Sequence, residues 1–180
     1  MIQRVQSLWL VLALCCIALS FMFPVASYQL MLSATQQRVE AEFNLVPKGN
    51  DAMFDQILNI DPVVEYSQTA SGFHTWPLVA VAALTAIVTL VCIFLFKNRV
   101  RQMRVVAVAF LLAVVYVFLL FFWAVDAYGK TVMRAMQGTD LQVSWMVGAY
   151  APIVALVFFV LAHRGIKKDE AKVRAADRLR

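Results

Sequence analysis

Four long apolar runs, separated by polar segments, organise this chain. They cover residues 8–28, 76–96, 105–125 and 143–162, and none of them contains Asp, Glu, Lys, Arg or His. Each run reaches the roughly 20 residues that a helix needs to cross a ~30 Å hydrocarbon core. Because hydrocarbon offers no water to unpaired backbone groups, a continuous helix is the expected spanning form. The pattern predicts an all-α membrane protein, a bundle of four transmembrane helices.

The polar segment at 29–75 is long enough to hold structure of its own. Residues 39–45 alternate between apolar and polar side chains, which is typical of a half-buried strand, and a second alternating stretch around 64–66 is a candidate to pair with it. Residues 51–58 place three apolar side chains on one face of a short helix. We therefore expect a small cap on the outer membrane face, while 126–142 forms a second outer loop.

The basic residues predict the orientation of the bundle. Twelve of the sixteen Lys and Arg residues precede the first run or lie in 97–104 or 163–180, whereas eight of the eleven acids lie in the two outer segments. By the positive-inside rule, both termini and the 97–104 loop are cytoplasmic. This distribution also accounts for the net charge of +5, so nucleic acid is not an expected partner.

Composition supports lipid as the solvent for this surface. The chain is 62% hydrophobic with a mean hydropathy of +0.74, more apolar surface than a small soluble domain can bury. The first run resembles a signal peptide, but its apolar stretch continues to Pro24, beyond the usual length, so we expect it to remain as a helix.

The residues that usually carry chemistry are few and scattered. Cys15, Cys16 and Cys92 lie inside apolar runs, where a thiol keeps its proton and is a poor nucleophile. His74 and His163 fall at opposite membrane faces and cannot share a metal. We expect no catalytic residue, cofactor or metal site, and we do not expect an enzyme.

The fourth run carries a stripe of small residues at helical spacing. The predicted helix-packing residues are Ser144, Gly148, Ala151, Pro152 and Ala155. Small side chains let helix backbones approach closely in lipid. Packing within this bundle is the favoured interpretation, and a seam between copies is the alternative. Pro152 deprives one carbonyl of its donor, which predicts a kink that shapes packing or serves as a hinge.

The segment 163–180 is predicted to form a basic, weakly amphipathic cytoplasmic helix. Such a helix lies on anionic lipid or docks a protein, and the alternative is that its charges only fix topology. Acids are interleaved among its basic residues. The predicted docking residues are Lys167, Lys168, Asp169, Glu170, Arg174, Asp177 and Arg178.

Several short motifs together carry a family resemblance. They are MIQRVQSL at 1–8, WPL at 76–78, KNR at 97–99 with Gln102 and Arg104, Gly148 with Tyr150 and Pro152, and KKDEAKVRAADRLR at 167–180. With these motifs the chain resembles the domain-of-unknown-function family 4293, small membrane proteins of Gram-negative bacteria. The resemblance covers nearly the whole chain except 29–73, and the C-terminal motif is its most specific part. It implies a bacterial inner membrane and carries over no activity.

The function that these patterns favour is that of a non-catalytic inner-membrane protein which binds or scaffolds a partner through its C-terminal segment and outer cap. Membrane lipid and another membrane or cytoplasmic protein are the expected partners. The alternative is a small transporter or channel subunit acting as an oligomer. Transport sites usually place ionisable residues within the spans, and these four runs contain none.

Overall fold

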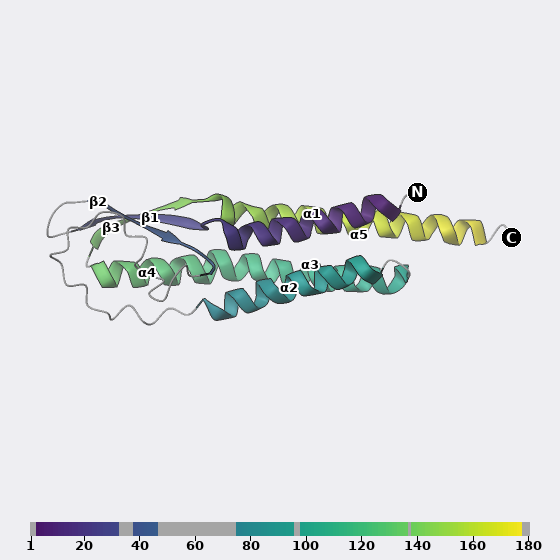
Figure 1. Cartoon of the computed structure of the whole chain (residues 1–180), viewed down its shortest axis with the longest axis horizontal. Coiled ribbons are helices and arrows are strands. Elements are labelled where there is room, and N and C mark those ends of the chain that lie inside the picture. Colours follow the sequence, from purple (N-terminus) through teal and green to yellow (C-terminus); the bar gives the residue numbers. More distant parts are fainter. Residues whose placement is uncertain (1–2, 33–37, 47–74, 96–97, 137, 178–180) are drawn as a thin grey trace. The chain divides into compact units, whose positions relative to one another are not determined.

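The computed structural model of this chain describes residues 3–32, 38–46, 75–95, 98–136 and 138–177 (Figure 1). Helix predominates and a small sheet is present. The helices are α1 (Gln3–Met22), α2 (Trp76–Phe94), α3 (Arg99–Phe118), a π-helical segment η2 (Leu119–Ala124), α4 (Val125–Met136) and α5 (Val147–Asp177). The strands are β1 (Ala26–Leu32), β2 (Arg38–Phe43) and β3 (Gly138–Trp145).

The described residues fall into two compact units. The first, here called the helical unit, contains the described parts of Met1–Leu19, Ala80–Val117 and Ala151–Arg180. The second, the sheet unit, contains those of Ser20–Val79 and Phe118–Tyr150. Because α1, α2 and α5 contribute residues to both, the same helices connect two differently built regions.

Three helical stretches within the described residues are long and apolar enough to cross a membrane. They are Trp76–Phe94, Val100–Met133 and Val147–Lys172. The apolar part of α1, Gln6–Met22, is shorter. Three helices of sufficient length therefore support a mostly helical membrane protein, while the expected bundle of four spanning helices is not confirmed and a small sheet is present.

The first predicted helix ends earlier than we expected. We predicted a helix through residue 28, but α1 ends at Met22 and residues 26–28 belong to β1. Pro24 explains the break, because proline disfavours helical backbone in the residue before it and cannot donate to a helix. The apolar run thus contains a helix followed by a buried strand. Hydrophobicity alone does not distinguish a buried strand from a continuation of the helix.

The fourth predicted helix begins later than we expected, for a related reason. Residues 143–145 lie in β3, and α5 begins at Val147. Tyr28, Ser27 and Ala26 stand opposite them in the ladder, so the backbone groups of both strands satisfy one another. At its other end α5 continues to Asp177, so most of the predicted C-terminal helix is one piece with the fourth apolar helix.

The polar segments hold more regular structure than predicted. Strand β2 overlaps the strand predicted at 39–45 and confirms it, and the expected loop at 126–142 contains most of α4 and most of β3. The sheet is antiparallel with the order β2-β1-β3. The helix predicted at 51–58 and the strand around 64–66 lie outside the described residues.

The part of α2 that is buried in the helical unit carries small and polar side chains. On α2, Ala82, Thr85, Thr89 and Cys92 are all fully buried. The Thr85 hydroxyl donates to the Val81 carbonyl and the Thr89 hydroxyl to the Thr85 carbonyl, both at 2.7 Å. Each hydroxyl thus donates its proton to a carbonyl of its own helix. This avoids the free-energy cost of burying an unpaired donor in apolar surroundings.

Candidate functional site

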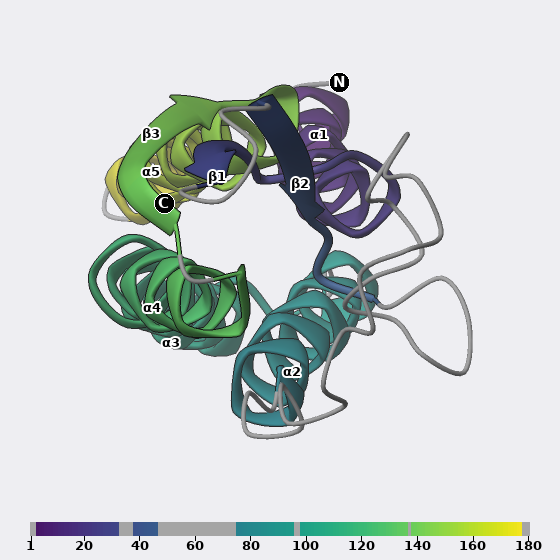
Figure 2. The same ribbon diagram turned by 90° about the vertical axis from the view of Figure 1, so that its left-hand side faces the viewer.

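Strand β1 is the centre of the sheet unit, and the segments on either side of it are fastened to it by backbone hydrogen bonds. The Val25 N–H donates to the Phe43 carbonyl at 2.8 Å, and the Met146 N–H donates to the Val25 carbonyl at 2.9 Å. Ala26 stands opposite Phe43 on β2 and Trp145 on β3. Residues widely separated in sequence therefore meet just after α1 ends (Figure 2).

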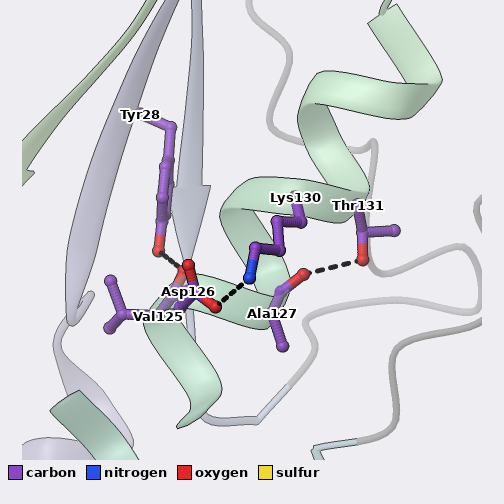
Figure 3. Close-up of polar contacts among 6 residues, drawn as sticks. All are labelled: Tyr28, Val125, Asp126, Ala127, Lys130 and Thr131. Atoms are coloured by element: carbon purple, nitrogen blue, oxygen red, sulfur yellow. Dashed lines mark hydrogen bonds and ion pairs between the residues drawn. The ribbon is translucent and has the colours of Figure 1, made fainter. Parts of the chain in front are cut away.

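Three aromatic rings join the sheet to α4. Tyr28 and Tyr128 have ring centroids 5.1 Å apart, and Phe43 and Tyr128 have theirs 4.8 Å apart. The Tyr28 hydroxyl donates to the Val125 carbonyl at 2.7 Å (Figure 3). The Tyr128 hydroxyl donates to the Glu42 carbonyl at 3.1 Å. Buried tyrosines usually find such a partner for their polar end. The rings thus form a locked aromatic cluster.

The Tyr28 hydroxyl stays protonated in this cluster. Burial, with smaller contributions from Tyr128 and Asp126, raises the pKa of Tyr28 well above its ordinary value of 10. An ionised hydroxyl could not donate to the Val125 carbonyl. The cluster therefore serves as a structural joint.

The π-helical segment η2 stands between α3 and α4. The Val125 N–H donates to the carbonyl of Leu120, five residues back, which widens the helix for one turn. Phe121 in this segment lies 4.7 Å from Trp145 between ring centroids, while Phe122 is 72% exposed. Such π-turns are frequent at functional positions; here it sets aromatic side chains beside the end of β3.

Gly148 makes the closest backbone approach among the predicted packing residues. A Cβ at this position would lie 2.5 Å from the Phe23 carbonyl oxygen and 2.6 Å from that of Pro24. The Gly148 N–H donates to the same Pro24 carbonyl at 3.0 Å. The approach is to the chain segment that follows α1, where no side chain fits.

The other predicted packing residues divide into two groups. Ala151, Pro152 and Ala155 are buried on α5, in the helical unit. Ser144 is exposed, and it lies on β3 opposite Ser27, so its placement on the fourth helix was wrong. The helix is continuous through Pro152.

The C-terminal stretch of α5 separates the predicted docking residues by exposure. Lys167 and Lys168 are exposed, Glu170 is half-buried, and Asp169 is buried at 7% exposure. The Asp169 carboxylate accepts a hydrogen bond from the Gln6 side-chain amide of α1. The side chains of Arg174 and Asp177, and the whole of Arg178, lie outside the described residues.

Gln6 makes a buried contact between helices that sequence reasoning missed. It is 6% exposed and connects α1 to α5 through its hydrogen bond to Asp169. Gly165 lies beside it, and a Cβ added at Gly165 would lie 3.2 Å from Gln6 Cγ. Trp9 stacks on Phe158 with ring centroids 5.7 Å apart, so the two helices are also joined by aromatic contact. The sequence signal was a polar residue two positions before an apolar run, and such a residue ordinarily indicates a solvated helix end.

Residues suited to metal binding or nucleophilic chemistry do not gather in the described part of the chain. No group of three or more His, Cys, Asp or Glu side chains there has the spacing to hold a metal ion. Cys15 is exposed and Cys92 is buried, and the buried Nδ1 of His163 has no hydrogen-bond partner among the described residues. The polar contacts described above are structural joints between segments.

A comparison with protein families decides the relationship of this chain. The model of the family described as "Domain of unknown function (DUF4293)" matches residues 2–179. The chain belongs to the DUF4293 family. The match includes both the helical and the sheet unit, so the two units are parts of one family domain, and it includes the segment 29–73 for which the sequence motifs offered no support. No curated protein matches the chain.

Proposed function

We propose that this DUF4293 protein is a four-span protein of a bacterial inner membrane, with both termini in the cytoplasm, and that it acts as a non-catalytic partner-binding or scaffold component. The charge distribution supports the orientation, because twelve of the sixteen Lys and Arg residues lie at the proposed cytoplasmic side. In this orientation the sheet unit lies on the outer side of the membrane and the C-terminal stretch of α5 on the inner side.

The observation that carries the partner-binding role is the edge strand β3. The order β2-β1-β3 leaves one side of β3 without a paired strand among the described residues. Residues Gln142, Val143, Ser144 and Trp145 are all exposed, and successive side chains point to opposite faces. Both faces of this part of β3 are therefore partly open, although the Trp145 ring contacts Phe121. An open edge of this kind is the usual template for adding a strand from a partner.

The rigidity of the sheet unit favours the same role. β1 is held on both sides, and the Tyr28 and Tyr128 hydroxyls fix α4 to the strands. A preorganised surface loses less entropy on binding than a loose loop. The transport alternative receives less support, because the Thr85 and Thr89 hydroxyl protons are already donated to carbonyls of α2.

The test is site-specific photocrosslinking in native membranes. A photoreactive amino acid replaces Gln142 on β3, and the matched control replaces Leu111, a 61% exposed residue of the apolar helix α3. We expect a recurrent protein adduct from position 142 and lipid adducts from position 111. If position 142 yields only self-adducts or lipid, the partner-binding role of β3 is wrong.

A further inference from the structure

The exposed cations of the C-terminal stretch of α5 share one face. Arg164, Lys167, Lys168 and Lys172 are all exposed. With 3.6 residues per turn, their spacing places them within about 140° of the helix circumference. We call these four residues the basic face.

The two acids within this stretch whose side chains the structure describes, Asp169 and Glu170, do not interrupt this face. Asp169 is 7% exposed, and its carboxylate accepts a hydrogen bond from the Gln6 side chain on α1. Glu170 is half-buried and takes part in an interaction of its own. The side chains that lie between the lysines on the exposed side are those of Ala171 and Ala175. The described surface is therefore more uniformly cationic than the sequence indicates.

The basic face also lies at a suitable depth for lipid headgroups, given the membrane orientation proposed above. Trp9 stacks on Phe158, and tryptophan prefers the boundary between hydrocarbon and headgroups. Arg164 and Lys168 follow Phe158 by six and ten residues, which corresponds to about 9–15 Å along the helix. Headgroup layers are roughly 5–8 Å thick, and charges act over a further ~8–10 Å in physiological salt.

We propose that the basic face binds the phosphate-bearing headgroups of anionic phospholipids, and that the Gln6–Asp169 contact keeps the face free of a competing carboxylate. Lipid is favoured over a protein partner by the side chains present. Tight protein interfaces are usually centred on several aromatic or arginine anchors, whereas this face offers Arg164 at its beginning and two alanines among flexible lysines. Lysine ammonium groups act as mobile point charges, which suits a fluid layer of phosphates.

The test uses the full-length protein in nanodiscs made of equal parts phosphatidylcholine and phosphatidylglycerol. Native mass spectrometry counts the lipids of each kind that the released protein retains. The triple variant Lys167→Gln/Lys168→Gln/Lys172→Gln is expected to lose its preference for phosphatidylglycerol, by up to about five-fold for each lysine that lies near a headgroup. Lys130→Gln, an exposed lysine of α4, is the control and is expected to retain it.

A second pair of variants tests the role of negative charge on the basic face. Ala171→Glu introduces a carboxylate among the lysines and is expected to reduce phosphatidylglycerol retention, whereas Ala171→Gln adds similar bulk without charge and leaves retention unchanged. Equal retention by the parent and the triple variant overturns the proposal. The proposal is also overturned, in favour of protein docking, by a second result for the triple variant. In that result the variant retains as much phosphatidylglycerol as the parent, but an acidic protein that co-purifies with the parent from native membranes is lost. Nanodiscs expose both leaflets to solvent, and the measurement involves no partner protein. The difference in phosphatidylglycerol retention therefore does not depend on the proposed orientation or on β3 binding a partner.

Discussion

The two units of this protein satisfy their polar groups in different ways. In the helical unit the Thr85 and Thr89 hydroxyls donate to carbonyls of their own helix, four residues back. In the sheet unit the Tyr28 and Tyr128 hydroxyls donate to carbonyls 97 and 86 residues away. Local satisfaction lets a helix enter lipid before it has found its neighbours, whereas the sheet forms only after distant segments have met.

The helical unit nevertheless contains two polar contacts between helices. Gln6 on α1 pairs with Asp169 on α5, and the Gln102 amide of α3 donates to the Cys92 carbonyl of α2 at 3.1 Å. Both contacts involve a residue near the beginning of one helix and one near the end of another. The comparison predicts that the sheet unit is sensitive to many single changes, while the helical unit is sensitive mainly at these contacts.

The largest effect is expected at Gly148. Gly148→Ala places a methyl group within 2.5–2.6 Å of two backbone oxygens that cannot move without disrupting the start of β1, and we expect a loss of about 3 kcal/mol, the upper end of overpacking costs. Gly165→Ala is the matched control in the same helix, because its new methyl group meets a side chain, that of Gln6 at 3.2 Å, and a shift of a few tenths of an ångström relieves the contact. Thermal unfolding in detergent measures both variants. Similar melting temperatures for the two would show that α5 is not confined at Gly148.

The next largest effect is expected at Gln6. Gln6→Leu leaves the buried Asp169 carboxylate without its donor, and a lost partner of a buried charged group costs roughly 2–3 kcal/mol. Replacing both partners by leucine removes the unpaired group as well, so the double variant is expected to recover much of the loss. The same melting experiment gives the coupling between the two sites. Strictly additive losses would contradict a direct pairing of Gln6 with Asp169.

A smaller loss is expected from Tyr28→Phe. The ring and its contact with Tyr128 remain, while the hydrogen bond to the Val125 carbonyl is lost, at a typical cost of about 1 kcal/mol. Tyr150→Phe removes the same atom from a side chain that is 54% exposed and is expected to change nothing measurable. Comparison of their unfolding temperatures checks this. The assignment of Tyr28 as a joint between β1 and α4 is wrong if the two variants behave alike.

The smallest effect is expected at the ion pair on α4. Lys130 and Asp126 are one turn apart with 2.6 Å between Nζ and Oδ2, and both side chains are more than half exposed. Exposed pairs at this spacing contribute about 0.3–0.5 kcal/mol and are screened by salt. Lys130→Gln should therefore lower the melting temperature slightly at low salt and not at all at high salt. A loss that persists in high salt would indicate a different role for Lys130.

The sequence predicted the helices better than it predicted where they end. Apolar runs free of charge identify helices of sufficient length, and they do so for Trp76–Phe94 without any tertiary information. The same runs hide the strand residues 26–28 and 143–145, because a buried strand is as apolar as a helix. For the first of these boundaries the sequence contained a signal, Pro24. Because proline disfavours helical backbone in the residue before it, Pro24 indicated that the helix ends at this point.

The candidate site was less accessible to sequence reasoning than the fold. Regular spacing indicated that Gly148 is closely packed, but its partner proved to be the Phe23–Pro24 backbone, which no helical pattern identifies. The burial of Asp169 depends on Gln6, a residue 163 positions away. The charges along the C-terminal segment therefore suggested a surface with both signs of charge. In the described fold the lysines of this segment are exposed, whereas Asp169 is buried.

The most direct test of the account is the accessibility of single cysteines in cells with an opened outer membrane. In a variant lacking Cys15, Cys16 and Cys92, cysteines replace Gln142 on β3, Asn98 before α3 and Ala171 on α5, all of which are exposed. The proposed orientation predicts that position 142 reacts with an impermeant maleimide, while positions 98 and 171 react only after the inner membrane is broken. Labelling of 98 and 171 in intact cells with 142 silent, or equal labelling of 142 and 171, would contradict it.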